Sequence, residues 1–178
     1  KYRVEGGEGH ALSPYAISKI ANEAHARVWG NASRMETIGL RFFNVYGPGQ
    51  LPDSDYSAVI PRFINGKAIT IYGDGKKIRD FTYVDDVCEA IELALTPDKP
   101  NVNYNVGTGI GTNLNELAAL MPKKEITHTE SRPADVLVSI ASTELAEEGL
   151  KFKAVVGIDE GIKRTVRYYE SLKNIHEL

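Results

Sequence analysis

The sequence predicts an α/β fold with parallel strands. A short, mostly apolar run at residues 37–45 has the pattern of a strand buried on both faces, which is typical of a parallel sheet. Predicted strands and helices then alternate along the chain, as they do in α/β proteins. With 178 residues, of which 42% are hydrophobic and 25% charged, the chain is long and apolar enough to form one globular domain with a sizeable core.

The first predicted helix covers residues 15–28. Residues 1–12 before it are polar and glycine-rich, and we expect a loop there. Ser13 suits the N-cap, because Pro14 would follow at the first helical position. Gly30-Asn31 is predicted to end the helix. Apolar residues recur at helical spacing at Ile17, Ile20, Ala24 and Val28.

Glycine turns and prolines separate the remaining predicted elements. Gly47-Pro48-Gly49 and Gly73-Asp74-Gly75 are predicted turns, and Pro97 and Pro100 follow a helix whose first turn carries Asp85 and Asp86. Extended chain or strands are predicted at residues 37–45, 69–72, 79–83, 102–106, 125–130 and 136–140. Helices are predicted at residues 57–65, 83–95, 113–120, 142–148 and 158–171.

Tyr15 and Lys19 form a candidate proton-transfer pair at the start of the first helix. A spacing of four residues places both side chains on one helix face, a turn apart. A lysine ammonium beside a phenol favours the phenolate, which can accept a proton at neutral pH. The spacing alone is common, however, and by itself it favours two solvated residues on an amphipathic helix.

Other kinds of site are not favoured by the sequence. Gly107, Gly109 and Gly111 lie at a strand-to-helix turn, but a dinucleotide-binding fingerprint would need its third glycine at Thr112. The scattered histidines predict no zinc site, and helix capping explains Asp85-Asp86 without a metal. No nucleophile elbow indicates a hydrolase. A net charge of −3 with mixed signs predicts neither nucleic acid nor a membrane as partner.

Three further residues are ambiguous when taken singly. Arg79 and Arg132 suit bidentate contact with phosphate, yet an isolated arginine is more often part of a surface ion pair. Tyr72 precedes a glycine turn and could stack on a planar base, or could cover the edge of the core. The single cysteine, Cys88, cannot form an internal disulfide, so we expect a cytoplasmic protein.

Taken together, seven stretches resemble the extended short-chain dehydrogenases/reductases, specifically the NAD-dependent epimerase/dehydratase family, and within it the UDP-glucose 4-epimerases. They occur in the family's order and cover nearly the whole chain. They are Ser13-Pro14-Tyr15-Ala16-Ile17-Ser18-Lys19, Arg41-Phe42-Phe43-Asn44-Val45-Tyr46-Gly47-Pro48-Gly49-Gln50, Ile60-Pro61-Arg62-Phe63, Ile71-Tyr72-Gly73-Asp74-Gly75, Arg79-Asp80-Phe81-Thr82-Tyr83-Val84-Asp85-Asp86-Val87, Tyr104-Asn105-Val106-Gly107-Thr108-Gly109 and Arg132-Pro133-Ala134-Asp135.

The resemblance implies a role for each matching residue. Tyr15 would be the general base and acid, and Lys19 would hold the nicotinamide ribose of NAD. Phe43 and Val45 would border the nicotinamide. The substrate-binding residues would be Asn44, Arg79 and Arg132 at the diphosphate, Val59, Ile60 and Tyr72 at the uridine, and Asp135 at the uridine ribose. Ala134 replaces the family's usual glycine, which puts the Asp135 contact in question.

The implied activity is NAD-dependent inversion at C4 of a UDP-sugar through a 4-keto intermediate, a step of galactose metabolism. A nucleotide-sugar dehydratase or decarboxylase, or a non-catalytic sugar-nucleotide-binding chain, remains an alternative. We expect a homodimer.

The resemblance also predicts the C-terminal part of a Rossmann-type fold. Residues 1–50 would end the NAD-binding domain, and residues 51–178 would form a small α/β substrate-binding lobe, with residues 80–108 returning to the Rossmann sheet. The family's glycine-rich unit would precede Lys1, so we expect this chain alone to be inactive.

Overall fold

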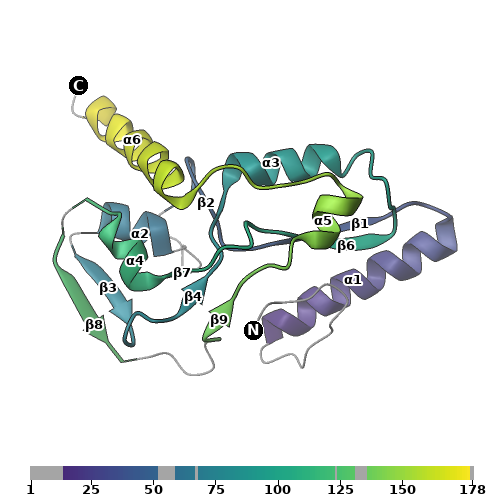
Figure 1. Cartoon of the computed structure of the whole chain (residues 1–178), viewed down its shortest axis with the longest axis horizontal. Helices are drawn as coiled ribbons and strands as arrows, with labels where there is room; N and C mark the ends of the chain where they lie inside the picture. Colours follow the sequence, from purple (N-terminus) through teal and green to yellow (C-terminus); the bar gives the residue numbers. More distant parts are fainter. Residues whose placement is uncertain (1–13, 52–58, 67, 123, 131–135, 177–178) are drawn as a thin grey trace.

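A computed structural model describes residues 14–51, 59–66, 68–122, 124–130 and 136–176 as an α/β protein (Figure 1). The helices are α1 (Pro14–Ser33), α2 (Val59–Asn65), α3 (Val84–Leu93), α4 (Leu114–Ala119), α5 (Glu144–Gly149) and α6 (Ile158–His176). The strands are β1 (Ile38–Phe42), β2 (Val45–Tyr46), β3 (Ile69–Tyr72), β4 (Ile78–Arg79), β5 (Thr82–Tyr83), β6 (Val102–Val106), β7 (Thr112–Asn113), β8 (Ile126–Thr129) and β9 (Val138–Ser139).

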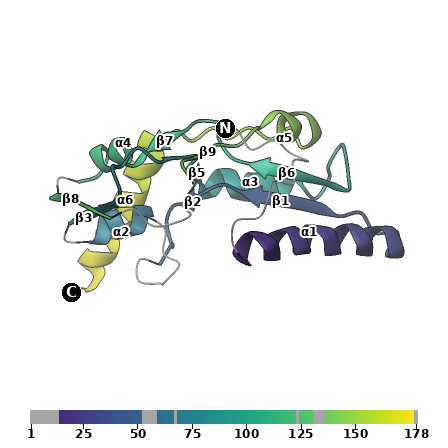
Figure 2. The same ribbon diagram turned by 90° about the horizontal axis from the view of Figure 1, so that it is seen from below.

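One layered half of the molecule is built on the parallel pair β1–β6. Its register runs from Ile38 opposite Val102 to Phe42 opposite Val106. Helix α1 lies on one side of this pair and α5 lies on the other (Figure 2). The buried side chains between β6, α3 and α5 form one core. The parallel pairing confirms the sheet type predicted from the apolar run at residues 37–45.

That predicted strand is divided in two by a change of partner. The amide of Phe43 still donates to the Val106 carbonyl at 3.0 Å, but the Asn44 carbonyl accepts from the Thr82 amide at 3.3 Å. The chain thus leaves β6 and continues as β2, which pairs in parallel with β5. The prediction of one strand over residues 37–45 was therefore wrong at this point, and the change of partner exposes the Asn44 side chain between two short strands.

A second core is formed by side chains of α2, α4, α6 and β3, together with Tyr46, Phe81 and Tyr83. Strand β3 also pairs in parallel with β8, whose four residues are exposed. Strand β4 lies between antiparallel β7 and parallel β9. The Lys124 ammonium donates to the Phe63 and Ile64 carbonyls, which satisfies carbonyls at the C-terminal end of α2. None of the helices in the described part of the chain combines the length and the apolar character needed to span a membrane.

Helix α1 continues past its predicted end. Gly30 lies inside the helix and is buried. The chain that follows the helix packs closely against it, since a Cβ on this residue would lie 3.0 Å from the Met35 carbonyl oxygen. The helix ends at Ser33, before Arg34 takes a left-handed φ of 54°. The glycine thus permits a close approach of the following chain and does not act as the C-cap that the sequence predicted.

A charged contact holds α1 to the sheet. Glu23 accepts from the Arg41 guanidinium at 2.6 Å through both carboxylate oxygens, and from the Asn103 amide at 3.1 Å. The hydrogen bonds from Arg41 lower the pKa of Glu23. Most of the helix is exposed, including Ile17 and Val28 from the predicted apolar face.

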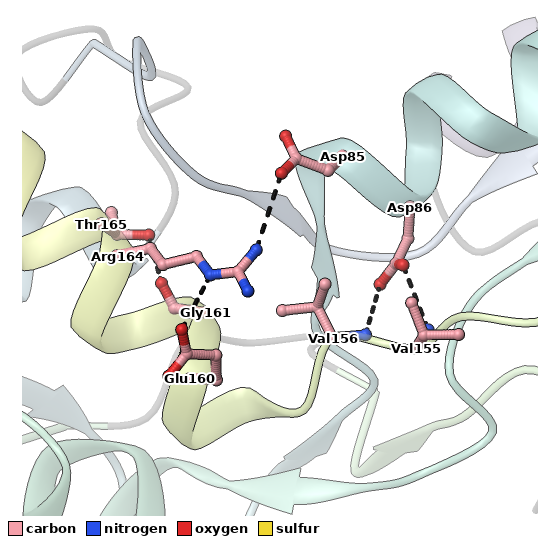
Figure 3. Close-up of polar contacts among 8 residues, drawn as sticks. All are labelled: Asp85, Asp86, Val155, Val156, Glu160, Gly161, Arg164 and Thr165. Atoms are coloured by element: carbon pink, nitrogen blue, oxygen red, sulfur yellow. Dashed lines mark hydrogen bonds and ion pairs between the residues drawn. The ribbon is translucent and has the colours of Figure 1, made fainter.

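The start of α3 is joined to the C-terminal segment by two aspartates (Figure 3). Asp86 is buried and accepts from the backbone amides of Val155 at 3.1 Å and Val156 at 3.2 Å. Asp85 is exposed and lies 3.8 Å from the Arg164 guanidinium, which also pairs with Glu160. Neither aspartate caps the helix through its side chain, because the N-cap is Tyr83 and makes no side-chain cap bond. Both aspartates do lie in the first turn of α3, as predicted, where the helix dipole favours acidic side chains.

We predict that Asp86→Ala destabilises the protein by about 3 kcal/mol, because two backbone amides lose a buried charged acceptor. Urea unfolding of the complete protein measures this loss. Asp85→Ala is the matched control, since it removes the neighbouring carboxylate from an exposed ion pair, and we expect a much smaller change. Equal losses for the two variants would contradict the role given to Asp86.

Candidate functional site

A pocket of about 230 Å³ opens where β2, β4 and the N-terminal ends of α2 and α4 meet. Five residues predicted to contact substrate or cofactor line it, although they come from segments far apart in the sequence. These are Asn44, Val45, Val59, Ile60 and Arg79. The other lining residues in the described part of the chain are Tyr46, Lys77, Phe81 and Leu114, none of which was predicted. Aromatic and aliphatic side chains combined with a few polar groups are typical of a small-molecule site.

Asn44 and Arg79 carry polar groups to the pocket on well-fixed backbone. The Asn44 side-chain amide donates to the Asp80 carbonyl at 2.9 Å, which orients an otherwise exposed side chain. The Arg79 guanidinium donates to the carbonyls of Ile78 at 2.9 Å and Leu137 at 3.5 Å. A guanidinium has five donors in a planar fork, the geometry that suits an anion, and these two bonds help to position Arg79 at the pocket.

The Asp80 carboxylate holds together the backbone segments next to Arg79, a role that was not predicted from the sequence. Its side chain is fully buried and accepts from the Thr108 amide and hydroxyl at 2.9 and 2.7 Å. It also accepts from the amides of Gly109 at 2.9 Å and Ala141 at 3.2 Å. Four donors satisfy the buried carboxylate, which offsets its desolvation. Asp80 therefore joins β4 to the turn after β6 and to the segment after β9.

Tyr15 and Lys19 lie together on α1, as their spacing predicted. The Lys19 ammonium is 5.2 Å from the centre of the Tyr15 ring, so the two side chains share one face of the helix. The Tyr15 side chain is 69% exposed, and a substrate can approach its hydroxyl. The Ser18 hydroxyl donates to the Tyr15 carbonyl at 2.7 Å within the same turn. The shared face is confirmed, and the catalytic role stays a prediction.

Two other predicted site residues that the structure describes, Phe43 and Tyr72, are not among the residues that line the pocket. Phe43 is buried directly after β1, and Tyr72 is half-exposed at the end of β3. Arg132 and Asp135 lie outside the described residues. Among the residues that the structure places, no group of His, Cys, Asp and Glu side chains is arranged to hold a metal ion.

Comparison with known proteins identifies the family. Residues 2–107 match the model of the NAD dependent epimerase/dehydratase family. The chain is 31% identical to a UDP-glucose 4-epimerase of Mycolicibacterium smegmatis over 89% of its length and 53% of the relative. It is 32% identical to a dTDP-glucose 4,6-dehydratase of Actinoplanes over 92% of its length and 54% of that protein.

A solved structure of UDP-glucose 4-epimerase with UDP-glucose from Thermotoga maritima superposes with a TM-score of 0.86 at 34% identity, covering 92% of this chain and 55% of that one. The likeness confirms the predicted Rossmann-type α/β fold. The chain spans about half the length of the curated relatives it matches. Because the family model matches more than half of it, this chain belongs to the NAD dependent epimerase/dehydratase family, for which NAD is the cofactor, as predicted.

Proposed function

We propose that the complete protein is an NAD-dependent UDP-sugar 4-epimerase, to which this chain contributes the proton-transfer pair and the sugar-nucleotide pocket. The observation that carries the proposal is the pocket itself, because it gathers five residues that the family resemblance assigns to substrate and cofactor. The T. maritima epimerase, whose structure holds UDP-glucose, has the same fold at 34% identity. The pairing of β5 and β6 with β2 and β1 supports the proposal that residues 80–108 return to the Rossmann sheet.

Tyr15 and Lys19 would bind the cofactor, and Tyr15 would transfer the proton of the sugar 4-hydroxyl. Their exposed hydroxyl and ammonium groups, on one helix face, fit the hydroxyl groups of a ribose, and Phe43 and Val45 would border the nicotinamide. NAD, when bound, supplies the hydride acceptor and donor for C4 of the sugar. Tyr15 would take the proton of the sugar 4-hydroxyl as the 4-keto sugar forms, and would return it after the sugar has turned over.

The pocket would hold the substrate by its nucleotide while the sugar turns over. Asn44 and Arg79, with Arg132, would bind the diphosphate, for which a guanidinium fork is well suited. Val59, Ile60 and Tyr72 would line the uridine site, with Asp135 at its ribose. Binding energy from these remote groups would keep the ketone intermediate in place and orient it for the return step.

A dehydratase is the second candidate, and a specific observation supports it. The identity to the Actinoplanes dehydratase, 32%, is as high as the identity to the M. smegmatis epimerase, 31%. A decarboxylase acting on a nucleotide sugar, or a non-catalytic sugar-nucleotide-binding chain, also remains open. We further propose a homodimer, for which the exposed Ile17 and Trp29 on α1 offer apolar surface, and a cytoplasmic location, in keeping with the single free Cys88.

The products formed by the complete protein test the proposal. With NAD and UDP-galactose, we expect NMR spectra to show UDP-glucose approaching an equilibrium mixture. A dehydratase would instead release water and accumulate a 4-keto-6-deoxy sugar. Binding of UDP with no NAD-dependent conversion of any UDP-hexose would favour the non-catalytic alternative. Either of these two results would contradict the epimerase proposal.

We predict that Arg79→Ala raises KM for the UDP-sugar by about 10- to 100-fold with a much smaller change in kcat, because a charged donor to the diphosphate is lost. Steady-state kinetics of the complete protein measures both constants. Arg167→Ala, which removes an exposed arginine from α6, is the control and should leave KM unchanged. An unchanged KM for Arg79→Ala would contradict the diphosphate contact.

A further inference from the structure

The pocket contains a second cation, Lys77. It lines the same cavity as Arg79 and Asn44, and its side chain is half-buried. Of the nine described residues that line the pocket, none is acidic. Two cations that line one partly buried cavity favour a ligand with more than one negative charge.

The strand geometry explains why Lys77 faces the same cavity as Arg79. Residues two apart in extended chain point to one face, and the residue between them points to the other. Ile78 does so, because its side chain lies where a Cβ on Gly111 would come, 2.5 Å away. Strand β4 is held on both sides, by β7 and β9, which fixes Ile78 and Arg79, and Lys77 directly precedes the strand.

The turn before Lys77 is anchored to α4. The Gly75 carbonyl accepts from the amides of Leu114 at 3.0 Å and Asn115 at 3.4 Å. The Asn115 side chain donates to the Asp74 carbonyl at 3.0 Å. Gly75 has a left-handed φ of 76°, and a Cβ there would lie 2.1 Å from Asn115 Oδ1. These contacts hold the turn before Lys77 against α4 without a ligand, so less ordering of this backbone is needed when a ligand binds.

We propose that Lys77 is a substrate-binding residue that contacts the second phosphate of the nucleoside diphosphate, opposite the Arg79 fork. This inference rests on the proposed function and deepens it. Arginine suits bidentate contact with one phosphate, whereas the compact lysine ammonium acts as a point charge and can balance the other. Lys77 would then make the pocket select diphosphates over monophosphates.

The neighbouring Lys76 offers a matched control. Its ammonium lies 3.5 Å from Asp74 in an exposed ion pair, and it does not line the pocket. Lys77→Met and Lys76→Met thus remove the same charge from adjacent positions and keep a similar apolar stem. Lys77→Arg keeps the charge at the pocket, so it separates loss of charge from a packing defect.

Calorimetric titration of the complete protein with UDP and UMP tests the inference. We expect Lys77→Met to weaken UDP binding about 10-fold at low salt and less at high salt, since a charge contact is lost. We expect UMP affinity to fall by less than about threefold, and Lys77→Arg to keep UDP affinity within about threefold of the wild type. Lys76→Met should bind both nucleotides as the wild type does.

Several outcomes would overturn the inference. One is a UDP affinity of Lys77→Met equal to that of Lys76→Met, and another is an equal loss of UDP and UMP affinity in Lys77→Met. Loss of UDP binding in Lys77→Arg as large as in Lys77→Met would show that packing, and not charge, is responsible. If the wild-type protein binds no UDP, the proposed function fails and this inference fails with it. If the wild-type protein binds UDP and any of these outcomes is found, only the role proposed for Lys77 is overturned.

Discussion

Replacing Tyr15 by Phe should lower kcat for UDP-sugar interconversion by about 100- to 10,000-fold, the usual contribution of a positioned general acid or base. The phenol hydroxyl is the only group that this substitution removes, and the ring that lies beneath the Lys19 ammonium remains. Tyr15 is largely exposed on α1, so its hydroxyl supports no buried packing and the protein should keep its stability. Steady-state kinetics with UDP-galactose and NAD measures the loss.

Two controls make this result specific to catalysis. UDP affinity, measured by calorimetry, should be unchanged in Tyr15→Phe, because Tyr15 does not line the pocket. Tyr168→Phe removes a phenol hydroxyl from α6 and should leave kcat unaltered. Full activity in Tyr15→Phe would mean that another group carries the proton and that the assigned base is wrong.

Asp80→Ala should destabilise the protein by about 4 kcal/mol. The substitution leaves the buried amide of Ala141 and the partly buried amides of Thr108 and Gly109 without their acceptor. It also opens a cavity at a fully buried site between β4 and the turn after β6. Urea unfolding of the complete protein should show a lower midpoint concentration, with an unchanged slope of the free energy of unfolding against urea concentration.

A graded pair of variants tests the reason given for this loss. Asp80→Asn keeps the shape and one acceptor oxygen but turns an amide group toward backbone donors, so we expect a smaller loss than for alanine. Asp98→Ala removes a carboxylate from an exposed ion pair with Lys151 and should change stability little. If Asp80→Ala is as stable as Asp98→Ala, the carboxylate does not hold these segments together.

The sequence predicted the bounds of those elements whose ends are set by the residues that directly flank them. Strands β3 and β6 have the predicted bounds, because glycine or polar residues flank both segments in the sequence. The end of α1 was missed because Gly30 is required by the chain that folds back at Met35. The division of β1 from β2 was missed because it depends on hydrogen bonds to Val106 and Thr82, which are distant in the sequence.

In the candidate site, too, some residues were predicted from sequence motifs, and others depend on contacts between segments that are distant in the sequence. The family motifs supplied Asn44 and Arg79, and the pocket includes both. Lys77 was missed, although its position two residues before Arg79 in extended chain was a usable signal. Asp80 stood in a recognised motif, but its role depends on donors at Thr108, Gly109 and Ala141, and no local pattern in the sequence indicates that these converge.

A crystal structure of the complete protein with NAD and UDP-glucose tests the central claim most directly. We predict that the diphosphate lies within hydrogen-bond distance of Asn44 and Arg79, with the Tyr15 hydroxyl facing O4 of the sugar. A diphosphate bound away from the pocket lined by these residues, or a sugar with C4 turned away from Tyr15, would contradict the account.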